Sequence, residues 1–193
     1  MKKIYICAVL TVLFASCSAE DGVTESTQKG NTIQTIPQVN WGTLIDDIQK
    51  SCESTKSYAS TAQLLLHVES MALANASFLA IVKPDYVSPT LTEMDDVMHM
   101  DAQQLINGMN YSATAKQYLQ NLVVNDTPWL VDPQLNTGLQ PKEVKLLQFL
   151  SDKNDPDDEW DTKKTLAFAY GYQQGPARAV VFTVMAHEFK KVK

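Results

Sequence analysis

The chain has few of the residues that cross-link a fold or carry nucleophilic catalysis. Its 193 residues include three cysteines and three histidines, so it is not a disulfide-rich scaffold and covalent catalysis has little material. Seven glycines and eight prolines exclude a collagen-like or low-complexity chain. Positive charge is also scarce, because 16 Lys and Arg stand against 22 Asp and Glu, a formal net charge of −6. This acidic balance argues against nucleic acid as a partner.

The chain does have the composition of one folded domain. Hydrophobic residues make up 45% and charged residues 20%, which is typical of a globular protein. The length suits one domain rather than two. Beyond the N-terminal stretch, no segment is apolar over the roughly 20 residues that a membrane-spanning helix needs.

The N-terminal stretch has the pattern of a secretory signal peptide. Lys2 and Lys3 precede an apolar run from Ile4 to Phe14, which is followed by small residues. A charged start, a short apolar core and small residues at the cleavage site define such a peptide. The run is too short for a transmembrane helix, so we expect residues 1–16 to be removed.

Phe14-Ala15-Ser16-Cys17 resembles the lipobox of bacterial lipoproteins, in which small residues precede an obligatory cysteine. The family prefers Leu at the position of Phe14. The resemblance implies cleavage before Cys17, lipidation of its thiol and acylation of its new amino group with fatty acids such as palmitate. Several acyl chains make a lasting membrane anchor. The alternative is an ordinary signal peptide with a chance cysteine.

The residues after Cys17 bear on where the anchor lies. In enterobacterial lipoproteins an Asp directly after the cysteine favours the inner membrane, and Ser18 stands there instead. The resemblance therefore implies the outer membrane of a Gram-negative envelope. Glu20-Asp21 is a weak version of a cell-surface signal, so the periplasmic and cell-surface sides both stay open.

The mature chain is expected to have two parts. Residues 17–40 are rich in Ser, Thr, Gly, Gln and Asn and bury too little apolar surface to fold, so they are interpreted as a flexible tether. Residues 41–193 form the folded domain. Its single cysteine, Cys52, shares an apolar helix face with Ile45 and Ile48 and is expected to be buried.

Helical spacing of apolar residues dominates the first part of the domain. Thr43 predicts a helix start, with a hydroxyl that can cap. Ser60 predicts a second start, and residues 62–82 are apolar on most sides, as in a central buried helix. The Ser/Thr-rich residues 54–61 leave open whether residues 43–82 form one helix or two.

The later part of the domain is also predicted to be helical. Ser88 and Pro89 predict the start of a helix that ends with Gly108 as its cap. Residues 177–189 follow a break at Gly175-Pro176 and have some strand character, but no other segment offers a convincing partner strand. Further helix starts are predicted at Ser112, Pro141 and Asp161. The pattern predicts an all-α fold, a single-domain bundle of about five to seven helices.

One methionine-rich segment suggests metal binding. Met94, Met98 and His99 are soft or borderline ligands that suit Cu(I). Met94 and Met98 share one helix face, but core packing gives the same spacing. Asp96 and His99 match half of a di-iron motif whose second copy is missing. We therefore expect no metal and no cofactor here.

The acidic residues 152–161 invite comparison with a calcium site. An EF-hand needs Gly at loop position 6 and an acid at position 12, whereas Asp157 and Lys163 stand there. An irregular calcium site through Asp155, Asp157 and Glu159 is the alternative to a solvated loop. We favour the solvated loop.

The expected function is non-enzymatic. The sequence has no Gly-x-Ser-x-Gly motif and no phosphate loop, and His187-Glu188 lacks the second histidine of a zinc protease motif. We expect a membrane-anchored lipoprotein that binds another, unspecified protein or stabilises the envelope. Two alternatives stay open: a periplasmic immunity-type inhibitor, whose acidity suits a basic toxin, and a ligand or metal carrier.

Overall fold

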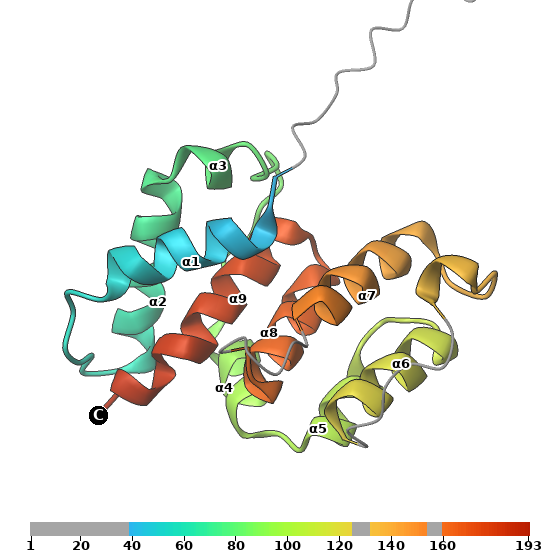
Figure 1. Ribbon diagram of the computed structural model, residues 1–193. Coiled ribbons are helices and arrows are strands. Elements are labelled where there is room, and N and C mark those ends of the chain that lie inside the picture. The colour runs from blue at the N-terminus through green and yellow to red at the C-terminus, as the bar shows by residue number, and fades with distance from the viewer. Residues whose placement is uncertain (1–38, 125–131, 154–159) are drawn as a thin grey trace, which may run out of the picture. The chain divides into compact units, whose positions relative to one another are not determined.

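A computed structural model describes residues 39–124, 132–153 and 160–193 (Figure 1). These residues belong to one compact unit. They contain α-helices and short 3-10 turns, and no strand forms among them. A single isolated β-bridge links Tyr58 with Val192. The all-α prediction is confirmed for the described chain.

The first helix starts earlier than predicted. Helix α1 spans Trp41–Cys52, and its cap is Asn40, whose side chain accepts a hydrogen bond from the Thr43 backbone N–H at 3.2 Å. The prediction of Thr43 as the start was wrong because Asn is itself a strong cap. The partly buried Trp41 ring packs against the core, and its centroid lies 5.6 Å from that of the Phe168 ring.

The question left open for residues 43–82 is answered by three helices. Helix α2 spans Thr61–Ala74 and helix α3 spans Ala76–Leu79. Ser60 caps α2 as predicted, accepting from the Gln63 backbone N–H at 3.2 Å. Asn75 ends α2 and its side chain caps α3, so one polar residue divides the apolar run.

The segment predicted as one helix ending at Gly108 is two helices. Helix α4 spans Leu91–His99 and helix α5 spans Ala102–Gly108. The start predicted at Ser88 was wrong: the cap is Thr90, which forms a reciprocal capping box with Glu93. Asp101 caps α5 and so interrupts the predicted helix. An acceptor side chain that satisfies the free N–H groups of a new first turn stabilises such a break.

The last four helices follow the sequence pattern closely. Ser112 and Asp161 cap their helices as predicted, and Pro141 is the first residue of its own. The bounds are Ala113–Val123 (α6), Pro141–Lys153 (α7), Thr162–Tyr172 (α8) and Pro176–Glu188 (α9), with 3-10 turns at Pro133–Leu135 (η1) and Phe189–Lys191 (η2). The described chain thus has nine α-helices, more than the five to seven expected, because caps divide two predicted segments. None of them is both long and apolar enough to cross a membrane.

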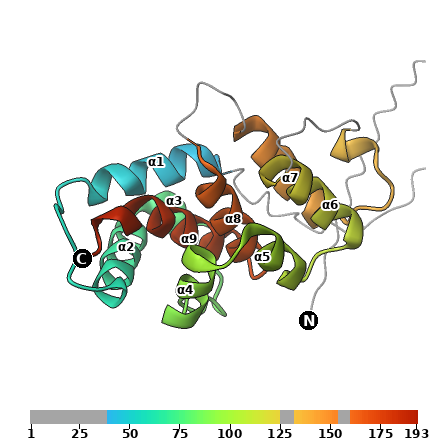
Figure 2. The same cartoon turned by 90° about the horizontal axis from the view of Figure 1, so that it is seen from below.

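Helices α8 and α9 form the centre of the domain (Figures 1 and 2). Helix α9 packs against α1 and α2, whereas α8 packs against α4, α5, α6 and α7. Most of α9 is buried, including the polar side chains of Arg178, Thr183 and Glu188. The two helices approach closely at Gly171, which has no side chain to separate it from Ala179.

Cys52 lies in the core at the end of α1, as predicted. Its side chain is fully buried, and burial together with the nearby charge of Glu188 raises the pKa of the thiol to about 11. The C-terminal residues close over this region, because the Tyr58 N–H donates to the Lys191 carbonyl at 2.9 Å and the Lys193 N–H donates to the Tyr58 carbonyl at 3.1 Å.

Candidate functional site

The metal-binding candidates of α4 occupy two different environments. Met94 and Met98 are buried in the hydrophobic core. The His99 side chain is 61% exposed and pairs with Asp95, with 2.9 Å between Nδ1 and Oδ1. Within the described chain, no group of three or more His, Cys, Asp and Glu side chains could hold a metal ion.

Two other sequence-based candidates cannot be placed. The calcium candidates Asp155, Asp157 and Glu159 lie outside the described residues, and so does the lipidation candidate Cys17.

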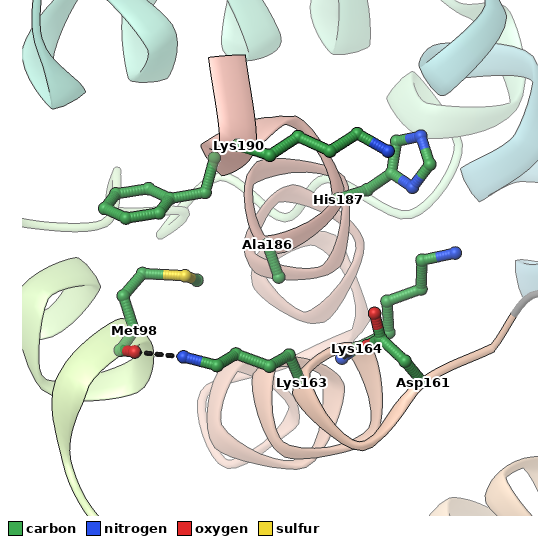
Figure 3. A pocket seen from close by; sticks show the side chains of 8 residues that line it. Met98, Asp161, Lys163, Lys164, Ala186, His187 and Lys190 are labelled. Atoms are coloured by element: carbon green, nitrogen blue, oxygen red, sulfur yellow. Dashed lines mark hydrogen bonds between the residues drawn. The ribbon is translucent and has the colours of Figure 1, made fainter. Parts of the chain in front are cut away.

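One cavity lies where three helices meet. It has a volume of about 370 Å³ and lies between the end of α4, the start of α8 and the end of α9 (Figure 3). We call it the lysine pocket. Its lining residues are Met98, Asp161, Lys163, Lys164, Ala186, His187, Phe189 and Lys190.

Positive charge dominates this lining. Three lysines face one aspartate, and a histidine lies beside them. Asp161 is partly occupied as the cap of α8, since its carboxylate accepts from the Lys164 backbone N–H at 2.8 Å. Among the described residues, the lining therefore carries a net positive charge.

Two of the lysines lie where helix stability does not favour them. Lys163 and Lys164 are in the first turn of α8, and the positive end of a helix dipole disfavours cations there. Lys190, in contrast, follows the C-terminal end of α9, where cations are favoured. Helix stability thus accounts for Lys190, whereas Lys163 is held by the Met98 carbonyl and Lys164 has an interaction of its own.

Each α8 lysine is held in place. The Lys163 ammonium donates a hydrogen bond to the Met98 carbonyl at the end of α4 (Figure 3). An ammonium has three donors, so Lys163 keeps two for other groups. Lys164 is only 6% exposed, so its charge lies in a poorly solvated position where electrostatic attraction is less screened.

The lysines of the pocket lower the pKa of His187. Partial burial, together with the charges of Lys164 and Lys190, lowers the pKa of its imidazole below the ordinary value. Glu188 acts in the opposite direction, with 3.8 Å between its Oε1 and His187 Nε2. His187 is therefore mostly uncharged at neutral pH, and bound negative charge would favour its protonation.

The pocket also has an apolar side. Met98, Ala186 and Phe189 supply hydrocarbon and sulfur atoms to its lining, and the Phe189 ring lies 5.6 Å from that of His99. In Figure 3, Met98 lies across the pocket from His187 and Lys164. The Lys163 ammonium contacts the Met98 carbonyl on that same side (Figure 3), so the cations are distributed around the pocket rather than gathered on one side.

A partly buried ion pair connects α4 to the N-terminal end of α9. The Arg178 side chain is 6% exposed, and its Nη2 lies 2.7 Å from Glu93 Oε2, while its Nη1 donates to Gln174 at 2.6 Å. Partial burial raises the pKa of Glu93, but hydrogen bonds from Thr90 and Arg178 outweigh it, and the pKa is lowered. This pair is a structural tie between the two helices.

Sequence analysis missed the lysine pocket. Its residues come from positions 98, 161–164 and 186–190, and no known spacing motif joins them. The available signal was local: Lys163-Lys164 stand in the first turn of the helix that Asp161 caps, which is an unfavourable place for two cations. No protein family model, no curated protein and no solved structure matches the chain.

Proposed function

We propose that the chain is a lipid-anchored, non-enzymatic protein of the cell envelope that binds an anionic ligand in the lysine pocket. The observation that carries the proposal is that Lys163, Lys164, Lys190 and His187 all line one cavity of about 370 Å³. Such a volume is within the range of small-molecule sites. The sequence left open the alternative of a ligand or metal carrier, and here the proposed ligand is an anion.

The chemistry of the lining supports binding rather than turnover. Among the lining residues there is no hydroxyl or thiol to act as a nucleophile. Lysine ammonium groups stabilise bound negative charge, and the acid beside them, Asp161, is engaged in capping α8. Such a lining can hold a charged ligand, and it offers no hydroxyl or thiol paired with a base.

Ligand-induced stabilisation tests anion binding. The full-length lipoprotein in detergent is heated with phosphate, sulfate or citrate against chloride at matched ionic strength. A ligand at 100 times its dissociation constant stabilises by about 2.7 kcal/mol. We expect at least one multivalent anion to raise the melting temperature of wild type.

Matched variants place that effect in the pocket. Lys190→Gln removes one cation of the pocket, and Lys50→Gln makes the same change at an exposed position on α1. A lost charge-assisted hydrogen bond costs about 1.5–3 kcal/mol, so Lys190→Gln should require about tenfold more anion, while Lys50→Gln behaves as wild type. Equal responses of both variants would contradict the proposal.

The proposed anchor is tested at Cys17. Cys17→Ser removes the thiol that the Phe14–Cys17 pattern offers for lipidation. Fatty-acid labelling and membrane fractionation should show label on the wild-type protein in the outer-membrane fraction, and no label on the variant. Equal labelling of both proteins, or an unlipidated and soluble wild type, would refute the anchor.

Protein binding is the second candidate, and exposed leucines favour it. On α2, the Leu66 side chain is 71% exposed and Leu73 is 48% exposed. Residues seven apart share one side of a helix. A photo-crosslinking residue at position 66 should capture one defined partner in cells, whereas the same residue at the exposed position 145 should not. Identical products at the two positions would remove this candidate.

A further inference from the structure

We infer that the outward side of helix α2 contacts the surface of the lipid bilayer. This side, the α2 face, consists of five exposed residues: Gln63, Leu66, Ser70, Leu73 and Ala74. The inference rests on the proposed lipid anchor, because the anchor holds the domain near a bilayer, and it names the part of the domain that touches the lipid. It does not depend on anion binding.

The five residues share one side of the helix, and none of them carries a charge. Positions three, four and seven apart are neighbours on a helix surface, and the residues that α2 buries in the core lie on the other side. Leu66 is 71% exposed and Leu73 is 48% exposed. The exposed sides of α1, α4 and α7 have charged residues instead, such as Asp46, Asp95 and Lys145. The α2 face is thus an uncharged surface with two exposed leucines.

Helix α2, all of whose residues are described, has two titratable residues, and each is bonded to a segment outside the helix. His67 Nε2 lies 3.4 Å from the Thr55 hydroxyl oxygen. The Glu69 carboxylate accepts a hydrogen bond from the Tyr86 hydroxyl at 2.7 Å and another from the Ser88 hydroxyl. Both titratable residues are partly buried. These contacts engage the two polar groups beside the α2 face and leave the face itself without an ionisable group.

The absence of charge favours lipid as the occupant of the α2 face. The chain has a net charge of −6, so anionic headgroups repel it as a whole. An uncharged face avoids this repulsion, and exposed leucines gain free energy when they enter the apolar boundary below the headgroups. Protein-binding surfaces, in contrast, depend on Trp, Tyr and Arg anchors, and the five residues of the α2 face include none of these.

The length of chain before the domain allows this contact. Residues 17–39 span at most roughly 75 Å at full extension. A domain of this size has a radius of gyration of about 15 Å, so the anchored domain can turn any of its sides to the bilayer. The chain joins the domain at α1, which packs against α2.

Introduced cysteines give a readout at the face itself, because the chain's own thiols do not interfere. In the proposed lipoprotein Cys17 carries lipid, and Cys52 is buried with its pKa raised to about 11. Leu73→Cys on the α2 face and Lys145→Cys on α7 are each labelled with the same environment-sensitive fluorophore. The full-length lipoprotein is then reconstituted in phosphatidylcholine vesicles that contain a nitroxide-labelled lipid, which quenches fluorophores in contact with the bilayer.

We expect the lipid nitroxide to quench the fluorophore at position 73 at least threefold more than the fluorophore at position 145. Two matched changes test the role of the leucines. Leu66→Gln in the Leu73→Cys protein should reduce the quenching at least twofold, because it removes the neighbouring apolar contact. Leu135→Gln, the same change at a 76% exposed position of η1, should leave the quenching unchanged.

The other outcomes overturn the inference in distinguishable ways. Equal quenching at positions 73 and 145 of the lipidated protein removes the bilayer contact and leaves the anchor standing. Shielding of position 73 from aqueous iodide without lipid quenching also overturns it. Loss of that shielding at one molecule per vesicle then identifies a second copy as the occupant, whereas a defined protein captured from position 66 in cells identifies the second candidate function. If fatty-acid labelling shows no lipid on the wild type, the anchor and the inference fail together, and anion binding is decided by its own assay.

Discussion

Replacement of Gly171 by alanine perturbs the centre of the fold directly. A Cβ atom at this position would lie 2.7 Å from the Ala179 Cα atom and 2.7 Å from the Arg178 carbonyl oxygen. Both are backbone atoms of α9, so no side chain can rotate to make room. Since α8 and α9 pack against each other at the centre of the domain, the extra methyl group must move one helix relative to the other.

The expected cost follows from two opposing effects. Overpacking a well-packed core costs about 1–3 kcal/mol, and contact with backbone places Gly171→Ala at the upper end of that range. Alanine recovers about 1 kcal/mol of helix propensity relative to glycine. The net loss is therefore about 2 kcal/mol, which lowers the melting temperature of a domain of this size by roughly 4–8 °C.

Gly108→Ala provides the matched control. Position 108 is also in a helix, but a Cβ atom there meets nothing within 4 Å, so the variant should be as stable as wild type or gain up to about 1 kcal/mol. Urea unfolding followed by far-UV circular dichroism gives both free energies. Equal stability of Gly171→Ala and wild type would refute the close approach of α8 and α9.

Three further predictions concern buried or shielded groups. Glu93→Ala leaves the Arg178 guanidinium buried without its carboxylate and should cost about 3 kcal/mol in urea unfolding; a loss below about 1 kcal/mol would contradict the structural tie. Cys52, buried and with its pKa raised to about 11, should react with a bulky maleimide only after unfolding, and fast labelling of the folded protein would refute its burial. Because the pKa of His187 is lowered on folding, the unfolded chain binds that proton more tightly. Stability that is present at neutral pH should therefore be lost as the pH falls below about 6.5. His187→Gln should weaken this loss, and an identical pH profile would contradict the shift.

The helix starts show how far local sequence signals reach. Ser60, Ser112 and Asp161 cap helices as predicted, because each side chain accepts a hydrogen bond from the backbone N–H three residues further on. The starts at Asn40 and Thr90 were missed because several capping residues stand close together there. The choice among them depends on packing, for instance on the Trp41 ring that enters the core.

The candidate site was less accessible to sequence analysis than the fold. The spacing of Met94 and Met98 fitted both a metal site and a core, and both side chains are buried in the core. Lys163 and Lys190 line the same pocket only because α8 packs on α9. No periodicity within one helix encodes a contact between two helices, so the pocket became visible only in three dimensions.

Calorimetric titration of the full-length lipoprotein with citrate tests the central claim most directly. The account predicts saturable binding at one site in wild type and in Lys50→Gln, and affinity at least tenfold weaker in Lys190→Gln, because a cation of the pocket is lost. Raised salt should weaken the wild-type affinity, since the attraction is electrostatic. The absence of saturable heat in wild type for citrate, phosphate and sulfate, or equal affinities of the two lysine variants, would contradict the claim that the lysine pocket is an anion-binding site.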